Sequence, residues 1–176
     1  SNIRIFFSES LSLNLSSRLE KPQSHYLTKV MRVKIGEKFS LFNKNGEWLA
    51  KIDNIQDGKV EFSIQEQLRK KENPMDIWLA FSPIKSNYSN FMIQKATELG
   101  VTKFFPIVFD RSIVRKINSE RLEKIIIEAT EQSNRMSPPC IEKTQNLKTF
   151  LEENEDTMDL IFTDLNSEKK KIDLDK

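Results

Sequence analysis

The sequence predicts an α+β protein of two domains, a mostly β domain followed by an α/β domain. Short β-rich segments in the first part are separated by two tight-turn signals, Asn45-Gly46 and Asp57-Gly58. A charged segment, residues 68–73, ends at Pro74 and interrupts that pattern. Beyond it, apolar strand-like segments alternate with amphipathic helical ones, which is typical of βαβ units and a parallel sheet.

The first domain, residues 1–72, is predicted to be a small β-barrel. We expect strands over residues 3–7, 39–42, 47–55 and 60–64. Pro22 begins a helical turn between the first two strands, and the following residues place four apolar side chains on one side: Tyr26, Leu27, Val30 and Met31.

The second domain, residues 74–176, is predicted to alternate strands and helices. We expect strands over 77–81, 104–109 and 160–162, and helices over 88–99, 118–135 and 147–151. The first helix should pack through Tyr88, Met92, Ala96 and Leu99 and end at Gly100, which adopts positive φ without strain. The long helix carries an apolar stripe and is stopped by Pro138-Pro139.

Composition narrows the classes of function. The chain has 176 residues and no apolar run near the ~18 residues of a membrane helix, and its N-terminus lacks a signal-peptide pattern, so we expect a cytoplasmic protein. Cys140 and His25 are the only cysteine and histidine, which leaves too few ligands for a Cys/His zinc site, and we expect no metal. Four glycines are too few for a glycine-rich phosphate loop.

Charge is unevenly distributed along the chain. The net charge is only +2, but residues 1–73 carry 13 Lys/Arg against 9 Asp/Glu. A modestly basic first domain is compatible with a phosphate-backbone partner, although a solvated surface would give the same count.

Three polar clusters are candidates for function. HYLTKVMR, residues 25–32, is either a basic recognition turn or a plain amphipathic turn. DRSIVRK, residues 110–116, directly follows a predicted strand, where α/β proteins bind ligands, but an exposed basic loop would look the same. EATEQSNR, residues 128–135, ends the long helix with one polar face, in which Glu131 and Arg135 could form an ordinary i,i+4 ion pair.

The order of these motifs resembles one known family. QKATELGV, then a strand and DRS, then EATEQSNR followed by two prolines, is similar to the RsmE family of the SPOUT superfamily, and HYLTKVMRVKIGE resembles that family's N-terminal motif. The resemblance implies a PUA-like RNA-binding barrel followed by part of an α/β trefoil-knot methyltransferase domain. It also implies a homodimer that methylates N3 of a uridine in small-subunit ribosomal RNA with S-adenosylmethionine.

The resemblance also suggests roles for individual residues. The catalytic residues would be Arg111, Gln132 and Arg135, in a cleft that Gln94, Glu98 and Ser112 also border. The RNA contacts would be Arg4, His25, Lys29, Arg32, Lys95 and Arg115. Removing the N3 proton of uridine requires positioning and electrostatic help rather than a metal, so an arginine could stabilise the developing anion. No proton acceptor is assigned.

Two family motifs are absent from residues 1–176, a GPEGG loop and a later LGxxILRxETA segment. We therefore expect the S-adenosylmethionine site to lie beyond this chain, and this chain alone not to methylate. Two alternatives remain open, a non-catalytic RNA-binding module and a generic α/β protein with an unrelated small ligand.

Overall fold

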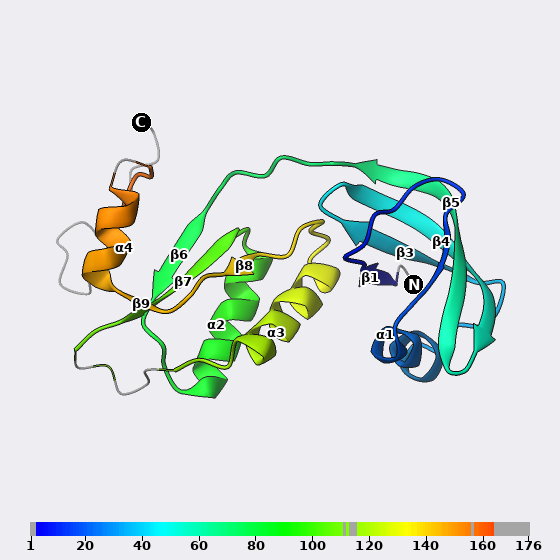
Figure 1. Cartoon of the computed structure of the whole chain (residues 1–176), viewed down its shortest axis with the longest axis horizontal. Helices are drawn as coiled ribbons and strands as arrows, with labels where there is room; N and C mark the ends of the chain where they lie inside the picture. Colours follow the sequence, from blue (N-terminus) through cyan, green and yellow to red (C-terminus); the bar gives the residue numbers. More distant parts are fainter. Residues whose placement is uncertain (1–2, 111, 113–115, 156, 164–176) are drawn as a thin grey trace.

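A computed structural model describes residues 3–110, 112, 116–155 and 157–163 (Figure 1). In the first domain the elements are β1 (Arg4–Phe6), β2 (Ser16–Arg18), α1 (Lys21–His25), the π-helical η1 (Tyr26–Val30), β3 (Lys38–Asn43), β4 (Gly46–Gln56) and β5 (Lys59–Lys70). In the second they are β6 (Trp78–Phe81), α2 (Ser86–Glu98), β7 (Lys103–Val108), α3 (Ser119–Gln132), β8 (Cys140–Ile141), β9 (Gln145–Asn146) and α4 (Leu147–Asn154).

The first domain is a five-stranded mixed sheet in the order β1-β3-β4-β5-β2. β1 pairs in parallel with β3, and the other neighbours are antiparallel. A hairpin forms at each predicted signal. Asp57 and Gly58, both at positive φ, are the turn residues between β4 and β5, whereas the turn between β3 and β4 is Lys44-Asn45, and Gly46 is the first residue of β4. One face of the sheet covers a core in which Phe39, Leu41 and Phe62 are almost fully buried.

The helical turn after Pro22 forms, but its buried face differs from the prediction. Leu27 is fully buried, whereas Tyr26 is 40% exposed and Val30 is 58% exposed. The cause is the wider π turn, in which the Met31 N–H donates to the Tyr26 carbonyl at 2.9 Å. This extra residue in the turn rotates Tyr26 and Val30 out of the core.

The second domain is a parallel α/β sandwich. β7 is central, with β6 on one side and the short strands β8 and β9 on the other, all parallel to it. Along β7 the side chains alternate between faces: Phe104 packs with the cluster under α2 and α3, while Phe105 packs with Phe150 of α4. Figure 1 shows α2 and α3 side by side, with α4 at the far end of the sheet.

Helix α2 packs on the sheet through only part of the predicted face: Met92 and Ala96 contact the core as predicted, but Tyr88 and Leu99 do not. Its fully buried residues are Ile93 and Thr97, with Ser89 nearly so, whereas Tyr88 is 68% exposed and Leu99 is 83% exposed. Gly100 has φ +110 and ends the helix as predicted.

Two other predicted boundaries are wrong. β5 continues through the charged segment to Lys70, since residues 65–70 pair with the long strand β4. Residues 160–162 are not a strand: their apolar side chains are exposed, and no described strand pairs with them. The division into residues 1–72 and 74–176 remains a prediction.

The described part of the chain contains no helix with the length and apolar character needed to cross a bilayer.

Candidate functional site

Two of the three predicted clusters meet in one groove between the domains. β1 forms its floor, α1 and η1 form one wall, and α3 forms the other, enclosing about 770 Å³. The barrel contributes Ile3, Arg4, Ile5, Pro22, Gln23, Tyr26 and Met31, and α3 with its following turn contributes Lys124, Ile127, Glu128, Glu131, Gln132 and Asn134. The HYLTKVMR and EATEQSNR motifs, about 100 residues apart in sequence, therefore face each other.

The floor of the groove is fixed from both walls. The side-chain amide of Gln23, on α1, donates to the Phe6 carbonyl at 2.7 Å. The Phe6 N–H donates to the Glu131 carboxylate, on α3, at 2.9 Å. β1 is an edge strand of its sheet, so Glu131 satisfies a donor that would otherwise have no partner in the ladder. Burial is the main cause that raises the pKa of Glu131, and the neighbouring Glu128 carboxylate adds to this.

Arg4, predicted to contact RNA, instead joins the two domains. Its side chain is 5% exposed and forms an ion pair with Glu47 of β4 at 3.0 Å. The same guanidinium donates to the carbonyls of Thr130, Glu131 and Arg135, at 3.3, 2.9 and 2.8 Å. A cation is favoured at this position because helix C-terminal carbonyls carry partial negative charge. The prediction for Arg4 is wrong, since no part of its guanidinium is left for a phosphate.

A second arginine reinforces this joint. Arg69 of β5 forms an ion pair with the other oxygen of Glu47 at 3.2 Å and also donates to the Asn134 carbonyl and side-chain oxygen, each at 3.0 Å. Asn134 has φ +62, a left-handed conformation that asparagine tolerates better than most residues. The turn after α3 is thus held by two barrel arginines around one buried carboxylate, a group we call the Glu47 joint (Arg4, Glu47 and Arg69).

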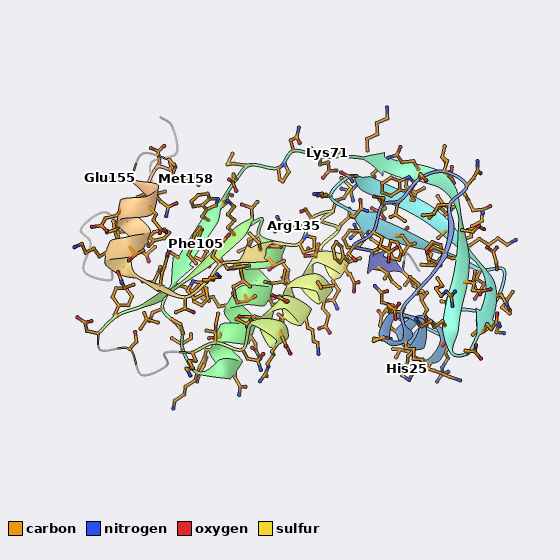
Figure 2. The ribbon with its side chains drawn as sticks, viewed as in Figure 1. His25, Lys71, Phe105, Arg135, Glu155 and Met158 are labelled. Atoms are coloured by element: carbon orange, nitrogen blue, oxygen red, sulfur yellow. The ribbon has the colours of Figure 1, made fainter. Side chains whose placement is uncertain are left out.

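Of the three predicted catalytic residues, the structure describes Gln132 and Arg135, and their side chains have different surroundings. Gln132 is exposed at the end of α3 and lines the groove. Arg135 lies near the domain junction (Figure 2), where it donates to the carbonyls of Thr97 and Val101, both at 2.7 Å, and so closes the C-terminal end of α2. Burial lowers the pKa of its guanidinium. Arg111 lies outside the described residues.

The second cluster lies at the opposite end of α3. The hydroxyl oxygens of Ser112 and Ser82 are 3.4 Å apart, and Ser112 accepts the Phe109 N–H at 2.9 Å, at the carboxyl ends of the parallel strands β6 and β7. The 14-residue α3 is about 20 Å long. Ser112 and Gln132 therefore belong to separate regions within one chain.

The remaining predicted RNA contacts are mostly exposed. His25, Lys29 and Arg32 are exposed on the α1–η1 turn, beside the groove, and Figure 2 labels His25 there. Lys95 is exposed on α2, where it forms an ion pair with Glu98 at 2.8 Å. Arg115 lies outside the described residues.

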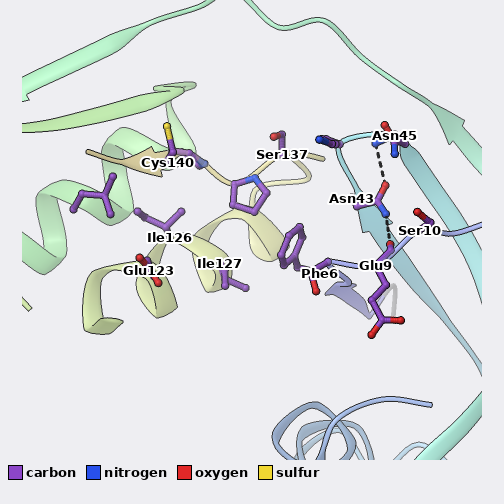
Figure 3. A pocket seen from close by; sticks show the side chains of 15 residues that line it. Phe6, Glu9, Ser10, Asn43, Asn45, Glu123, Ile126, Ile127, Ser137 and Cys140 are labelled. Atoms are coloured by element: carbon purple, nitrogen blue, oxygen red, sulfur yellow. Dashed lines mark hydrogen bonds between the residues drawn. The ribbon is translucent and has the colours of Figure 1, made fainter. Parts of the chain in front are cut away.

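A second cavity, of about 630 Å³, lies on the other side of β1 (Figure 3). Phe6 stands between the barrel residues Glu9 and Asn43 and the α3 residues, and Asn43 donates to the Glu9 carbonyl at 2.8 Å. Cys140 is at its far end, and burial with the nearby Glu142 raises the pKa of the thiol, which disfavours the nucleophilic thiolate. Within the described residues, no group of three or more His, Cys, Asp or Glu side chains is placed to hold a metal ion.

A barrel with an exposed basic turn, docked on a parallel α/β domain, is the arrangement of a two-domain RNA-modifying protein, and comparison with known families agrees. The RNA methyltransferase domain family matches residues 71–176, and the RNA methyltransferase PUA domain family matches residues 19–65. The chain belongs to this RNA methyltransferase family, and its fold class is as predicted.

Individual relatives cover most of the chain. This chain is 36% identical to the ribosomal RNA small subunit methyltransferase E of Rickettsia conorii over 157 residues. The matched region makes up 88% of this chain and 64% of that protein. The structure of the Neisseria gonorrhoeae enzyme bound to S-adenosyl methionine matches with a TM-score of 0.77 at 28% identity, covering 86% of this chain and 65% of that one. A putative methyltransferase from Legionella pneumophila in complex with SAM matches with a TM-score of 0.80 at 27% identity, covering 95% and 72%.

Proposed function

We propose that the complete protein transfers a methyl group from S-adenosylmethionine to N3 of a uridine in small-subunit ribosomal RNA. The observation that carries this proposal is the match of both parts of the chain, in order, to the two domains of RNA methyltransferases. The chain spans 64% of the Rickettsia relative's length, so the activity is proposed for the whole protein.

The part played by residues 1–176 is to bind and orient RNA. On the exposed turn at His25, Lys29 and Arg32, the lysine and the arginine supply cations for the phosphate backbone. The described residues supply no glycine-rich cradle for the methyl donor, because the four glycines lie in separate turns. Ser112 lies beside the carboxyl ends of the parallel strands β6 and β7, where α/β proteins bind their ligands.

A direct experiment separates this proposal from a non-catalytic RNA-binding module. A small-subunit RNA fragment would be incubated with S-adenosylmethionine and either the 176-residue chain or a version extended through a glycine-rich loop, and the nucleosides analysed by mass spectrometry. We expect 3-methyluridine only with the extended version. If the extended version binds the RNA but neither binds the donor nor forms 3-methyluridine, the RNA-binding module is the correct function.

We also propose a cytoplasmic homodimer. The exposed side of α2 carries Tyr88, Phe91 and Leu99, each more than 60% exposed, which is unusual for large apolar side chains on one helix. Sedimentation of the whole protein should give the mass of a dimer, and Phe91→Glu should shift it to a monomer. A wild-type monomer at micromolar concentration would refute this part.

A further inference from the structure

We propose that the groove between α1–η1 and α3 binds one unpaired nucleotide of the RNA, other than the methylated uridine, and prefers a base with an exocyclic amino group. The inference rests on the proposed RNA substrate and adds a base-reading subsite to it.

The groove has the size and the apolar surface for a base. Its volume, about 770 Å³, lies within the ~300–1,000 Å³ of small-ligand pockets. Tyr26 lies on its wall with 40% of its surface exposed, and Pro22, Ile3 and Met31 continue the apolar lining. Unpaired RNA bases stack on exposed aromatic rings of this kind, and the π turn of η1 is what moves Tyr26 out of the core.

The groove also has a basic side and an acidic side, which suit the phosphate and the base of a nucleotide respectively. Lys21, His25 and Lys29 are exposed and adjoin the lining residues Pro22 and Tyr26 along the chain, so the α1–η1 side offers groups that suit a phosphate. The α3 wall carries one cation, Lys124, and two carboxylates, Glu128 and Glu131, which repel each other and would repel a phosphate placed beside them. A nucleotide whose phosphate lies on the α1–η1 side and whose base enters the groove satisfies both walls.

The acidic wall determines which base is favoured. Carboxylates accept hydrogen bonds, and the amino groups of adenine, cytosine and guanine donate them, whereas uracil has carbonyl oxygens at the equivalent positions. Glu131 already accepts the Phe6 N–H, so the exposed Glu128, one turn earlier, is the reader, and Gln132 lies beside it.

The test measures RNA binding by fluorescence anisotropy with the 176-residue chain and labelled nonamers, U4-X-U4, where X is G, A, C or U. We expect each amino-bearing X to bind several-fold more tightly than U. Tyr26→Ala should weaken binding of those oligonucleotides about 5- to 100-fold, the range for losing one base stack, while Tyr26→Phe, which keeps the ring, should bind as the wild type does.

Glu128→Gln and Glu120→Gln form a matched pair on the same helix. Both remove one negative charge, but Glu120 lies in the first turn of α3, at the end away from the groove. Charge alone predicts that both variants bind every oligonucleotide more tightly. We expect this tighter binding of every oligonucleotide only for Glu120→Gln. We expect Glu128→Gln to bind the nonamers with G, A or C at the central position no more tightly than the nonamer with U.

The outcomes distinguish the subsite from the function. If the wild type binds all nonamers equally, or if Glu128→Gln behaves as Glu120→Gln does, the subsite is refuted and RNA binding stands. If no nonamer binds with an affinity that falls as salt rises, the RNA-directed function fails as well.

Discussion

Replacing Arg4 with methionine tests the Glu47 joint most directly. The change leaves Glu47, whose side chain is 3% exposed, with only Arg69 as a cation, and removes the donor to three carbonyls in the last turn of α3 and the turn that follows it. Losing one partner of a buried ion pair costs about 3–5 kcal/mol, and each lost hydrogen bond costs roughly 0.5–1.5 kcal/mol. The remaining Arg69 contact and the apolar methionine offset part of this, so we expect a loss of about 3–5 kcal/mol.

The assay is urea unfolding followed separately in each domain. Trp48 belongs to the barrel core, and Trp78 packs beside Phe105 in the second domain, so single-tryptophan variants report on one domain each. In the parent the two transitions should coincide because the joint couples the domains. In Arg4→Met the two unfolding transitions should separate, and unfolding should begin at a lower urea concentration than in the parent.

An ion pair within the barrel serves as the control. Lys59 and Glu20 are 3.0 Å apart, but their side chains are 26% and 73% exposed, so Lys59→Met should cost less than about 1 kcal/mol. If Arg4→Met costs no more than Lys59→Met, or if its two tryptophan transitions still coincide, Arg4 is not the coupling residue that the structure indicates.

Three further predictions concern single sites. Burial raises the pKa of Glu131, so the folded protein holds the carboxyl proton of Glu131 more tightly than the unfolded chain does, and it loses stability as the pH rises through that pKa. Glu131→Gln should therefore flatten the fall of the urea midpoint between about pH 4 and pH 7. An unchanged slope of the urea midpoint against pH would contradict the burial effect. Arg135→Met removes two hydrogen bonds to carbonyls at the end of α2, so amide exchange should accelerate in the last turn of α2 more than in its first turn, whereas uniform acceleration would count against a local role. Gly46→Ala should destabilise the protein by about 3 kcal/mol or more in urea unfolding, because a Cβ there would lie 2.5 Å from a backbone carbonyl of β5. Gly36→Ala is the control: Gly36 has open space around it, so the variant should lose only about 1 kcal/mol. Similar losses in the two variants would argue against the steric cause.

Elements with local signals could be predicted from the sequence. The Asp57-Gly58 pair specifies its hairpin by its own backbone preferences, and Gly100 specifies a helix end in the same way. The Asn45-Gly46 signal marked a hairpin, but its turn lies one residue earlier, at Lys44-Asn45. Such signals depend on neighbouring residues and need no knowledge of the rest of the fold.

The buried face of α2 could not be read from hydrophobicity alone. Ser89 and Thr97 are polar in composition but buried, and the Ser89 hydroxyl can be buried because it donates to the Ile84 carbonyl at 2.9 Å. Tyr88 and Leu99 look apolar in the sequence, yet they face away from the sheet. A periodicity count therefore assigned the helix a face rotated from the real one.

Long-range polar contacts are the other class that sequence reasoning missed. Arg4 lies in a β-rich segment and was assigned to RNA as an ordinary surface cation, while Glu47 and Arg69 were not singled out at all. Their partners are 22 to 131 residues away, so no local spacing points to them. A lone charge in an otherwise apolar strand is the only available signal, and by itself it does not name a partner.

The Glu47 joint also has a consequence for synthesis on the ribosome. The barrel is complete once Lys70 has emerged, and Arg4 and Glu47 can then pair within it, but the carbonyls that Arg4 needs belong to residues 130–135. At roughly 5–20 residues per second, those residues are made several seconds later. During that interval the guanidinium at the edge of the newly folded first domain lacks the three carbonyl acceptors that residues 130–135 later supply, so the two domains can be joined only after α3 has been made.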